Sequence, residues 1–174
     1  ENSLHNHQIL YIMGKEKEKI IRWDYLEYTY EDKKAEEYLY QGESFFQEGR
    51  YTQTIDALSA CLKSTLSEDA GWIACRAYNI LGDLFLFSGY ETAAMENYLN
   101  AKQKARDRKV SRQGVYAEIK IGLLYDNMRG AEEALRHLDC AIEESRQTEK
   151  IDYEVLAEAY IQKAYIYCKE GSFQ

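Results

Sequence analysis

Three histidines are the side chains in this sequence best suited to acid–base or metal chemistry: His5, His7 and His137. His5 and His7 form a pair in a polar N-terminal segment, whereas a metal site needs about three or four converging ligands. His137 stands beside the apolar Leu138 on an expected helix, where a structural role is the simpler interpretation. The histidines therefore predict neither a metal site nor a general base.

Catalytic motifs give no stronger indication. The sequence has no phosphate-binding glycine loop, GxSxG turn, HExxH pair or calcium loop. Carboxylate runs such as EEAL are typical of solvated helix faces. The four cysteines are far apart and form no CxxC pair, so each is expected to be a small apolar residue on a helix: Cys61, Cys75, Cys140 and Cys168. We therefore expect no enzyme, no metal, no cofactor and a cytoplasmic location.

One basic cluster remains, the segment KQKARDRKVSR at 102–112. Cations at the C-terminal end of a helix complement its dipole, which is the simpler interpretation. The alternative is a docking patch for an acidic partner.

Composition indicates a folded, helical chain. Of 174 residues, 45% are hydrophobic and 30% charged, and none is proline. The formal net charge of −8 disfavours nucleic acid, which requires a basic face. No apolar run approaches the roughly 18 residues of a membrane span. An all-α class fits these features.

An internal repeat organises the chain after residue 34. Gly42, Gly82 and Gly122 stand 40 residues apart, and Ala164 takes the same place in a fourth, shorter copy. We call these four positions the register positions. Each of the four is followed three residues later by an aromatic ring, and each of the three glycines is followed sixteen residues later by a large apolar residue, Leu58, Tyr98 or Leu138. Small residues let two helices cross closely, and the large residues fill the space beside the crossing.

Each copy is expected to be helix, tight turn, helix. Glycine marks the turns QEGRY, FSGY, MRGA and KEGSF, because glycine can end a helix at positive φ. The expected pairs are 34–48 with 52–65, 69–87 with 91–107, and 111–128 with 131–148, followed by an unpaired helix over 153–169.

This pattern resembles the tetratricopeptide repeat (TPR) family. Leu81-Gly82, Phe85, Gly89, Ala94, Tyr98 and Ala101 make the best copy of its signature. The resemblance implies a right-handed superhelix of antiparallel helix pairs. The repeat is longer than the family's usual 34 residues and lacks its proline, as helices lengthened by about six residues would explain.

The expected domains are a capping segment of one or two helices at 1–33 and the repeat array at 34–174. A cap is expected because an end repeat leaves one apolar face uncovered. The array has three full copies and the first helix of a fourth.

The resemblance also implies a concave groove lined by the first helix of each unit. The positions three before, one after and four after each register position are expected to face it: Leu39, Glu43, Phe46, Asn79, Asp83, Leu86, Ile119, Leu123, Asp126, Ile161, Tyr165 and Cys168. Some family members hold a peptide carboxylate with a Lys/Asn/Arg clamp, but Glu43 and Asp83 would repel one. The alternative is that part of this face packs against neighbouring helices.

The function expected from this resemblance is a protein- or peptide-binding scaffold that prefers apolar or basic segments. We expect this scaffold to be the sensory module of a larger bacterial signalling protein, such as a GGDEF-type diguanylate cyclase. Two alternatives stay open: a peptide-pheromone receptor, and a self-association module that dimerises through the exposed C-terminal repeat.

Overall fold

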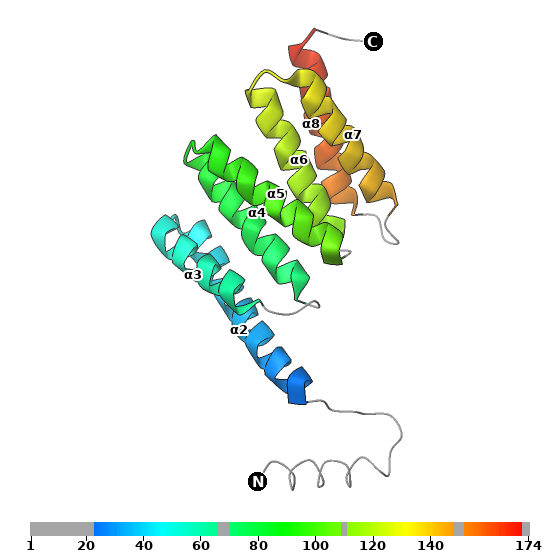
Figure 1. Ribbon diagram of the computed structural model, residues 1–174. Helices are drawn as coiled ribbons and strands as arrows, with labels where there is room; N and C mark the ends of the chain where they lie inside the picture. The colour runs from blue at the N-terminus through cyan, green and yellow to red at the C-terminus, as the bar shows by residue number, and fades with distance from the viewer. Residues whose placement is uncertain (1–22, 66–69, 109–110, 148–151, 172–174) are drawn as a thin grey trace, which may run out of the picture.

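A computed structural model describes residues 23–65, 70–108, 111–147 and 152–171. The described residues form seven α-helices and no strand. The helices follow one another as α2 (Trp23–Gln47), α3 (Tyr51–Ser64), α4 (Gly71–Phe87), α5 (Glu91–Arg108), α6 (Ser111–Asn127), α7 (Ala131–Arg146) and α8 (Tyr153–Lys169). They stack in chain order, so that α2 and α8 lie at opposite ends (Figure 1).

The stack consists of antiparallel pairs, α2 with α3, α4 with α5 and α6 with α7. Successive first helices, α2, α4, α6 and α8, also contact one another. The predicted all-α fold of repeated helix pairs is confirmed, and the expected helix boundaries agree within a few residues except at the start of α2.

The register glycines lie where the two helices of a pair cross. A Cβ on Gly82 would lie 2.5 Å from the ring of Tyr98, and one on Gly42 would lie 2.5 Å from Leu58. Such distances are well inside van der Waals contact, so no larger residue fits without a shift. The sequence interpretation of these glycines as close crossings agrees with the structure.

The turns differ from the prediction in the third unit. Gly49, Gly89 and Gly171 have positive φ, seven residues after their register positions. At the equivalent place in MRGA stands Arg129, with φ of 62°, while the neighbouring Gly130 has φ of −96°. The residue with positive φ thus stands at the same place of the repeat in every unit, even where that place is not occupied by glycine.

Arg129→Gly is expected to raise the free energy of unfolding by about 0.5 to 1 kcal/mol. A left-handed conformation costs an L-residue about 1–2 kcal/mol, which glycine avoids, although glycine loses more entropy on folding. Urea unfolding followed by circular dichroism measures the difference. Gly89→Ala is the control, since it should shift stability in the opposite direction. A lower stability of the Arg129→Gly variant would contradict this account.

The expected boundary between cap and array falls inside one continuous helix. Helix α2 begins at Trp23 and runs without interruption through residues 33 and 34. The helix thus runs from the expected cap into the array, and the division into cap and array stays a prediction. Residues 1–22 lie outside the described residues, and so do His5 and His7.

A buried ionic cluster joins the second and third units. Glu118 of α6 is 1% exposed and is ion-paired with Lys102 of α5. Its other oxygen lies 2.9 Å from Nδ1 of His137 on α7, whose ring stacks on Tyr125 with centres 5.0 Å apart. His137 therefore has the structural surroundings that its sequence position suggested. Lys102 belongs to the basic segment 102–112, so at least this residue of the segment does more than complement a helix dipole.

Candidate functional site

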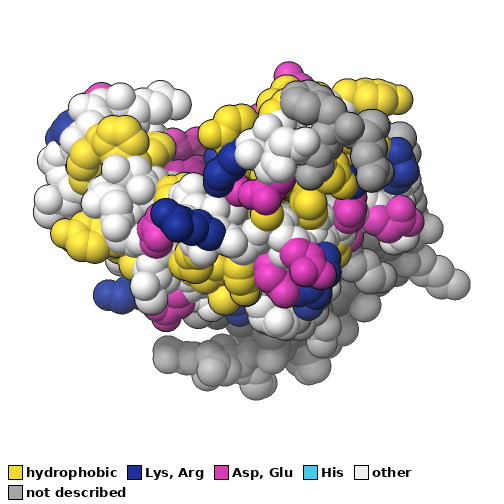
Figure 2. Space-filling model, turned by 90° about the horizontal axis from the view of Figure 1, so that it is seen from above, with side chains coloured by type: hydrophobic (Ala, Val, Ile, Leu, Met, Phe, Trp, Pro, Cys, Tyr) yellow, Lys and Arg dark blue, Asp and Glu magenta, His cyan; other side chains and the backbone are white. Residues whose placement is uncertain are grey.

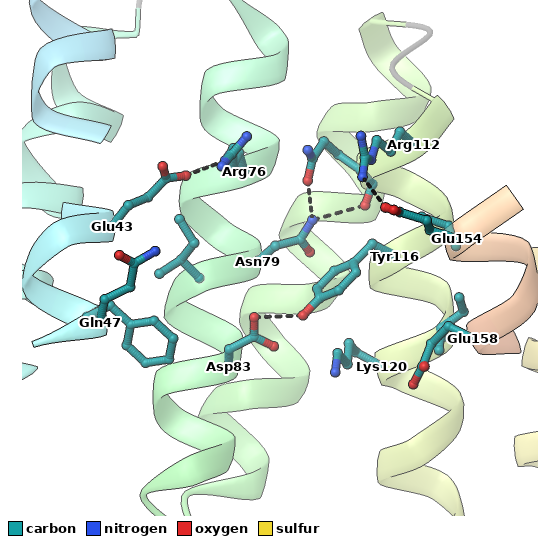
Figure 3. A pocket seen from close by; sticks show the side chains of 15 residues that line it. Glu43, Gln47, Arg76, Asn79, Asp83, Arg112, Tyr116, Lys120, Glu154 and Glu158 are labelled. Atoms are coloured by element: carbon teal, nitrogen blue, oxygen red, sulfur yellow. Dashed lines mark hydrogen bonds and ion pairs between the residues drawn. The ribbon is translucent and has the colours of Figure 1, made fainter. Parts of the chain in front are cut away.

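A cleft of about 670 Å³ is formed by the first helices of all four units. Its wall comes from α2, α4, α6 and α8, as the groove prediction requires (Figure 3). Acidic, basic and apolar side chains are mixed on the face seen from above, which is hollowed between its two sides (Figure 2). The cleft lining includes the carboxylates of Glu43 and Asp83 and the cationic groups of Arg76 and Lys120, so it has no single charge sign.

The cleft crosses the four helices obliquely. On α2 its lining begins one residue after Gly42, at Glu43, and continues to Gln47. On α8 the lining ends six residues before Ala164, at Glu158. Each successive helix therefore contributes a more N-terminal part of its length.

Polar contacts between successive first helices form the cleft wall. Glu43 of α2 is ion-paired with Arg76 of α4, 33 residues later. Asp83 of α4 accepts a hydrogen bond of 2.8 Å from the hydroxyl of Tyr116 of α6, also 33 residues later. Glu43 and Asp83 both follow a register glycine directly. The contact between successive first helices therefore recurs at the same position of the repeat, as an ion pair at Glu43 and as a hydrogen bond from a phenol at Asp83.

Asp83 lies in the cleft wall without a cationic partner among the described residues. It accepts hydrogen bonds from Tyr98, at 2.7 Å, and from Tyr116. Burial, followed by the nearby Asp83 charge, raises the pKa of both phenols above the ordinary value. Both hydroxyls therefore remain protonated donors at neutral pH, and Asp83 presents a negative charge to the cleft.

Asn79 lies one helical turn before Asp83 and is only 3% exposed. Its amide nitrogen donates to the backbone oxygen of Gln113 at 3.0 Å and to that residue's Oε1 at 3.1 Å. Because the backbone oxygen can only accept, these bonds fix which side of the amide is nitrogen. The remaining oxygen, Oδ1, is buried and has no partner within the described part of the chain.

The far end of the cleft carries two further charges. Lys120 of α6 lies over the ring of Tyr116, 5.0 Å from its centre, and has no carboxylate partner among the described residues. Glu158 of α8 accepts a hydrogen bond from Gln162 at 2.7 Å. At the rim, Arg112 is 2.9 Å from Asp152 and 3.6 Å from Glu154. The cleft therefore offers both an ammonium group and carboxylates to a ligand (Figure 3).

The structure brings five of the twelve predicted groove residues together on the cleft: Glu43, Phe46, Asn79, Asp83 and Ile119. The other seven lie elsewhere. Leu39 is fully buried between α2 and its neighbours, so it is a core residue. Leu86 packs, partly buried, against the core shared by α5 and α6, and Leu123 is half-buried beyond the cleft.

The remaining misplaced residues belong to the C-terminal halves of α6 and α8. Asp126 is buried and its Oδ1 lies 3.0 Å from Nζ of Lys169. Ile161 and Tyr165 are exposed outside the cleft, and so is Cys168. They fall outside because the cleft moves towards the N-terminal ends of the later helices.

Sequence reasoning missed ten cleft residues: Gln47, Arg76, Ile80, Arg112, Gln113, Tyr116, Lys120, Glu154, Val155 and Glu158. One signal could have found two of them, Arg76 and Tyr116. An acceptor one position after a register glycine is followed 33 residues later by a donor, as in Glu43–Arg76 and Asp83–Tyr116.

The described residues contain no group of three His, Cys, Asp or Glu side chains placed to hold a metal ion. None of their helices combines the length and apolar character that crossing a membrane requires.

A solved structure with a similar fold is the crystal structure of the apo form of RapI. The TM-score is 0.73 at 17% sequence identity, over 82% of this chain and 39% of RapI. This chain thus spans less than half of RapI's length, and the likeness shows a common fold. No family model matches the sequence. No curated protein matches it either. The helical repeat is therefore established, and the tetratricopeptide assignment stays a prediction.

Proposed function

We propose that this chain binds an extended peptide segment of another protein, or a free peptide, in the cleft between its first helices. The proposal is one of binding rather than catalysis. Its main support is Asn79, whose carbonyl oxygen is buried in the cleft wall without a hydrogen-bond donor.

An unsatisfied buried acceptor is costly, so its retention in a cleft wall needs a reason. Gln113 holds the Asn79 amide from the other side, so that the orientation of Oδ1 is fixed before a ligand arrives. Oδ1 is buried in this structure, so a ligand would reach it only after a small opening of the cleft wall. A backbone N–H of a peptide is a donor of the right kind, and an acceptor that is oriented in advance lowers the ordering cost of binding.

The charges of the cleft favour a basic or donor-rich segment over an acidic one. Asp83 and Glu158 face the cleft without a cationic partner among the described residues, whereas Arg76 and Arg112 are already paired with carboxylates. Lys120 offers one point for a carboxylate or carbonyl oxygen. Ile80 and Phe46 add apolar surface between these groups.

A fluorescence polarisation screen tests this function. The probes are fluorescein-labelled peptide pools in three matched sets, which carry Lys, Leu or Glu at one otherwise identical position. We expect the Lys set to bind most tightly and the Glu set least tightly. Asn79→Ala should weaken binding about tenfold, as loss of one buried hydrogen bond implies.

Asn100→Ala is the matched control, because Asn100 is an exposed asparagine on α5, outside the cleft. Thermal unfolding of both variants shows whether the fold is kept. Equal affinities of Asn79→Ala and Asn100→Ala for the same peptides would place the binding site elsewhere. Failure of every set to bind would reject the peptide function itself.

The signalling context is the finer part of the proposal. A binding module in a larger bacterial regulator, including a GGDEF-type enzyme or a peptide-pheromone receptor, fits a scaffold whose cleft has a preformed acceptor. Sequencing the gene on both sides of this segment tests the context, since a regulator requires an output domain or a further array.

A further inference from the structure

Three aromatic rings form a row that leads out of the cleft across the turns of the first two units. Phe46 lines the cleft on α2. Its ring centre lies 6.3 Å from that of Tyr51, the first residue of α3. The Tyr51 ring centre lies in turn 5.8 Å from that of Phe87, the last residue of α4. The two turns lie beside each other on one side of the stack (Figure 1). We call Phe46, Tyr51 and Phe87 the aromatic ledge.

Phe87 is the most exposed of the three residues, with 74% of its surface accessible. The repeat itself does not require an aromatic residue at this place. Five residues after the register position, the other units have Gln47, Asn127 and Lys169. A polar side chain therefore serves the same turn equally well, and a ring that stays in water adds little to folding stability. Phe87 is thus better explained by a contact with a ligand than by the packing of the array.

The polar side chains of the adjoining turn are already bonded to one another. Glu48 accepts hydrogen bonds from Ser44 at 3.0 Å and from Arg50 at 2.8 Å. Arg50 also donates to Gln53, and its guanidinium lies 4.3 Å from the ring centre of Phe45. The charges described in this turn are therefore paired, and what the ledge offers to a ligand is apolar ring surface.

We propose that the aromatic ledge binds a large apolar side chain of the peptide that occupies the cleft. The inference rests on the proposed function, because the ledge joins the cleft through Phe46, and a peptide that leaves the cleft at α2 meets the ledge next. A basic residue at Asp83 and an apolar residue at Phe87 then define the ligand class. It is an extended segment whose side chains change from basic to apolar along its length.

The arrangement of the rings suits such a side chain. The planes of neighbouring rings are inclined by 48° and 57°, so the ledge presents angled faces rather than a flat stack. Tyr51 is held between its two neighbours, and a surface that is already positioned loses less freedom when a ligand covers it. Covering Phe87 removes apolar area from water, which corresponds to a gain in affinity of about tenfold.

Fluorescence polarisation with lengthened peptides tests the inference. The probes are the fluorescein-labelled Lys set, lengthened at either end by two leucines or, as the matched set, by two serines. Leucines at the end that reaches the ledge should tighten binding about tenfold relative to serines. Phe87→Gln, which introduces the residue type of the first unit, should abolish this gain and leave the affinity for the original Lys set unchanged.

Leu99→Gln is the matched control, because Leu99 is a 50% exposed apolar residue on α5 that lines neither the cleft nor the ledge. This variant should keep the full gain from leucine. Circular dichroism melts should give the same melting temperature for both variants and the wild type, as expected for exposed sites.

Two results would reject the ledge while the proposed function stands, provided that Asn79→Ala still weakens binding of the original Lys set. One is the absence of a gain from leucine at either end, and the other is a gain that survives Phe87→Gln. If no peptide set binds, both the ledge and the proposed function are rejected.

Other occupants of the ledge give different results. A melting temperature that Phe87→Gln lowers and Leu99→Gln does not would show that a segment of the chain itself covers the ring. Self-association of the wild type that Phe87→Gln abolishes, measured by sedimentation velocity, would assign the ledge to a second copy. Either result would overturn the inference.

Discussion

Glu118→Ala is expected to lower the free energy of unfolding by about 3 to 5 kcal/mol, the range for a buried ion pair that loses one partner. Glu118 is 1% exposed and shares its two oxygens between Lys102 and His137. Its removal leaves the largely buried Lys102 ammonium without a counter-charge. It also removes the carboxylate through which α6 contacts Lys102 of α5 and His137 of α7. Chemical unfolding followed by circular dichroism measures the loss.

Two control variants help to distinguish the contributions of the lost charge and of the new cavity to the stability loss. Glu118→Gln removes the charge but keeps the volume and one acceptor oxygen, so it should lose less than Glu118→Ala, and the difference measures the cavity. Glu48→Ala removes a carboxylate that pairs with Arg50 on the surface, and it should cause no measurable change. If Glu118→Ala were as stable as Glu48→Ala, the cluster would contribute nothing to the fold.

Gly82→Ala should lower the free energy of unfolding by about 2 to 3 kcal/mol, although alanine usually stabilises helices. The added Cβ would lie 2.5 Å from the Tyr98 ring. That ring is fully buried, and its hydroxyl is bonded to Asp83, so it cannot move aside without losing the bond. Thermal and urea unfolding give the difference.

Gly122→Ala is the matched control at the same register position of the next unit. Its nearest neighbours, a backbone oxygen and Leu138, would lie 3.2 and 3.3 Å from the new Cβ. A small adjustment accommodates this methyl group, so stability should change by less than about 1 kcal/mol, with the gain in helix propensity offsetting the contact. Equal losses at Gly82 and Gly122 would show that helix crossing, rather than the Tyr98 ring, sets the cost.

The architecture could be predicted from the sequence because small residues, which permit two helices to cross closely, recur at a fixed interval. Gly42, Gly82 and Gly122 stand in one register, and their large partners follow sixteen residues later. A close helix crossing depends on the side-chain volumes at the crossing point, and the residue types give these volumes directly. The exception, Arg129 at positive φ, shows that the stacking of helices decides the turn where the local residue opposes it.

The cleft was only partly predictable, because its path depends on how successive first helices are displaced along one another. A projection that uses the same positions on every helix finds Glu43 and Asp83 but assigns Tyr165 to the groove, where Glu158 is found instead. The displacement accumulates from unit to unit, so errors are smallest at α2 and α4 and largest at α8. No single helix sequence contains this information.

Asp83 links the cleft to the packing of the array. One of its oxygens is bonded to Tyr98, which fills the crossing at Gly82, and the other to Tyr116 of the next unit. A ligand group that bonds to Asp83 competes with Tyr116 for the same carboxylate. Under the proposed function, a ligand at Asp83 would therefore act directly on a bond that joins the second and third units.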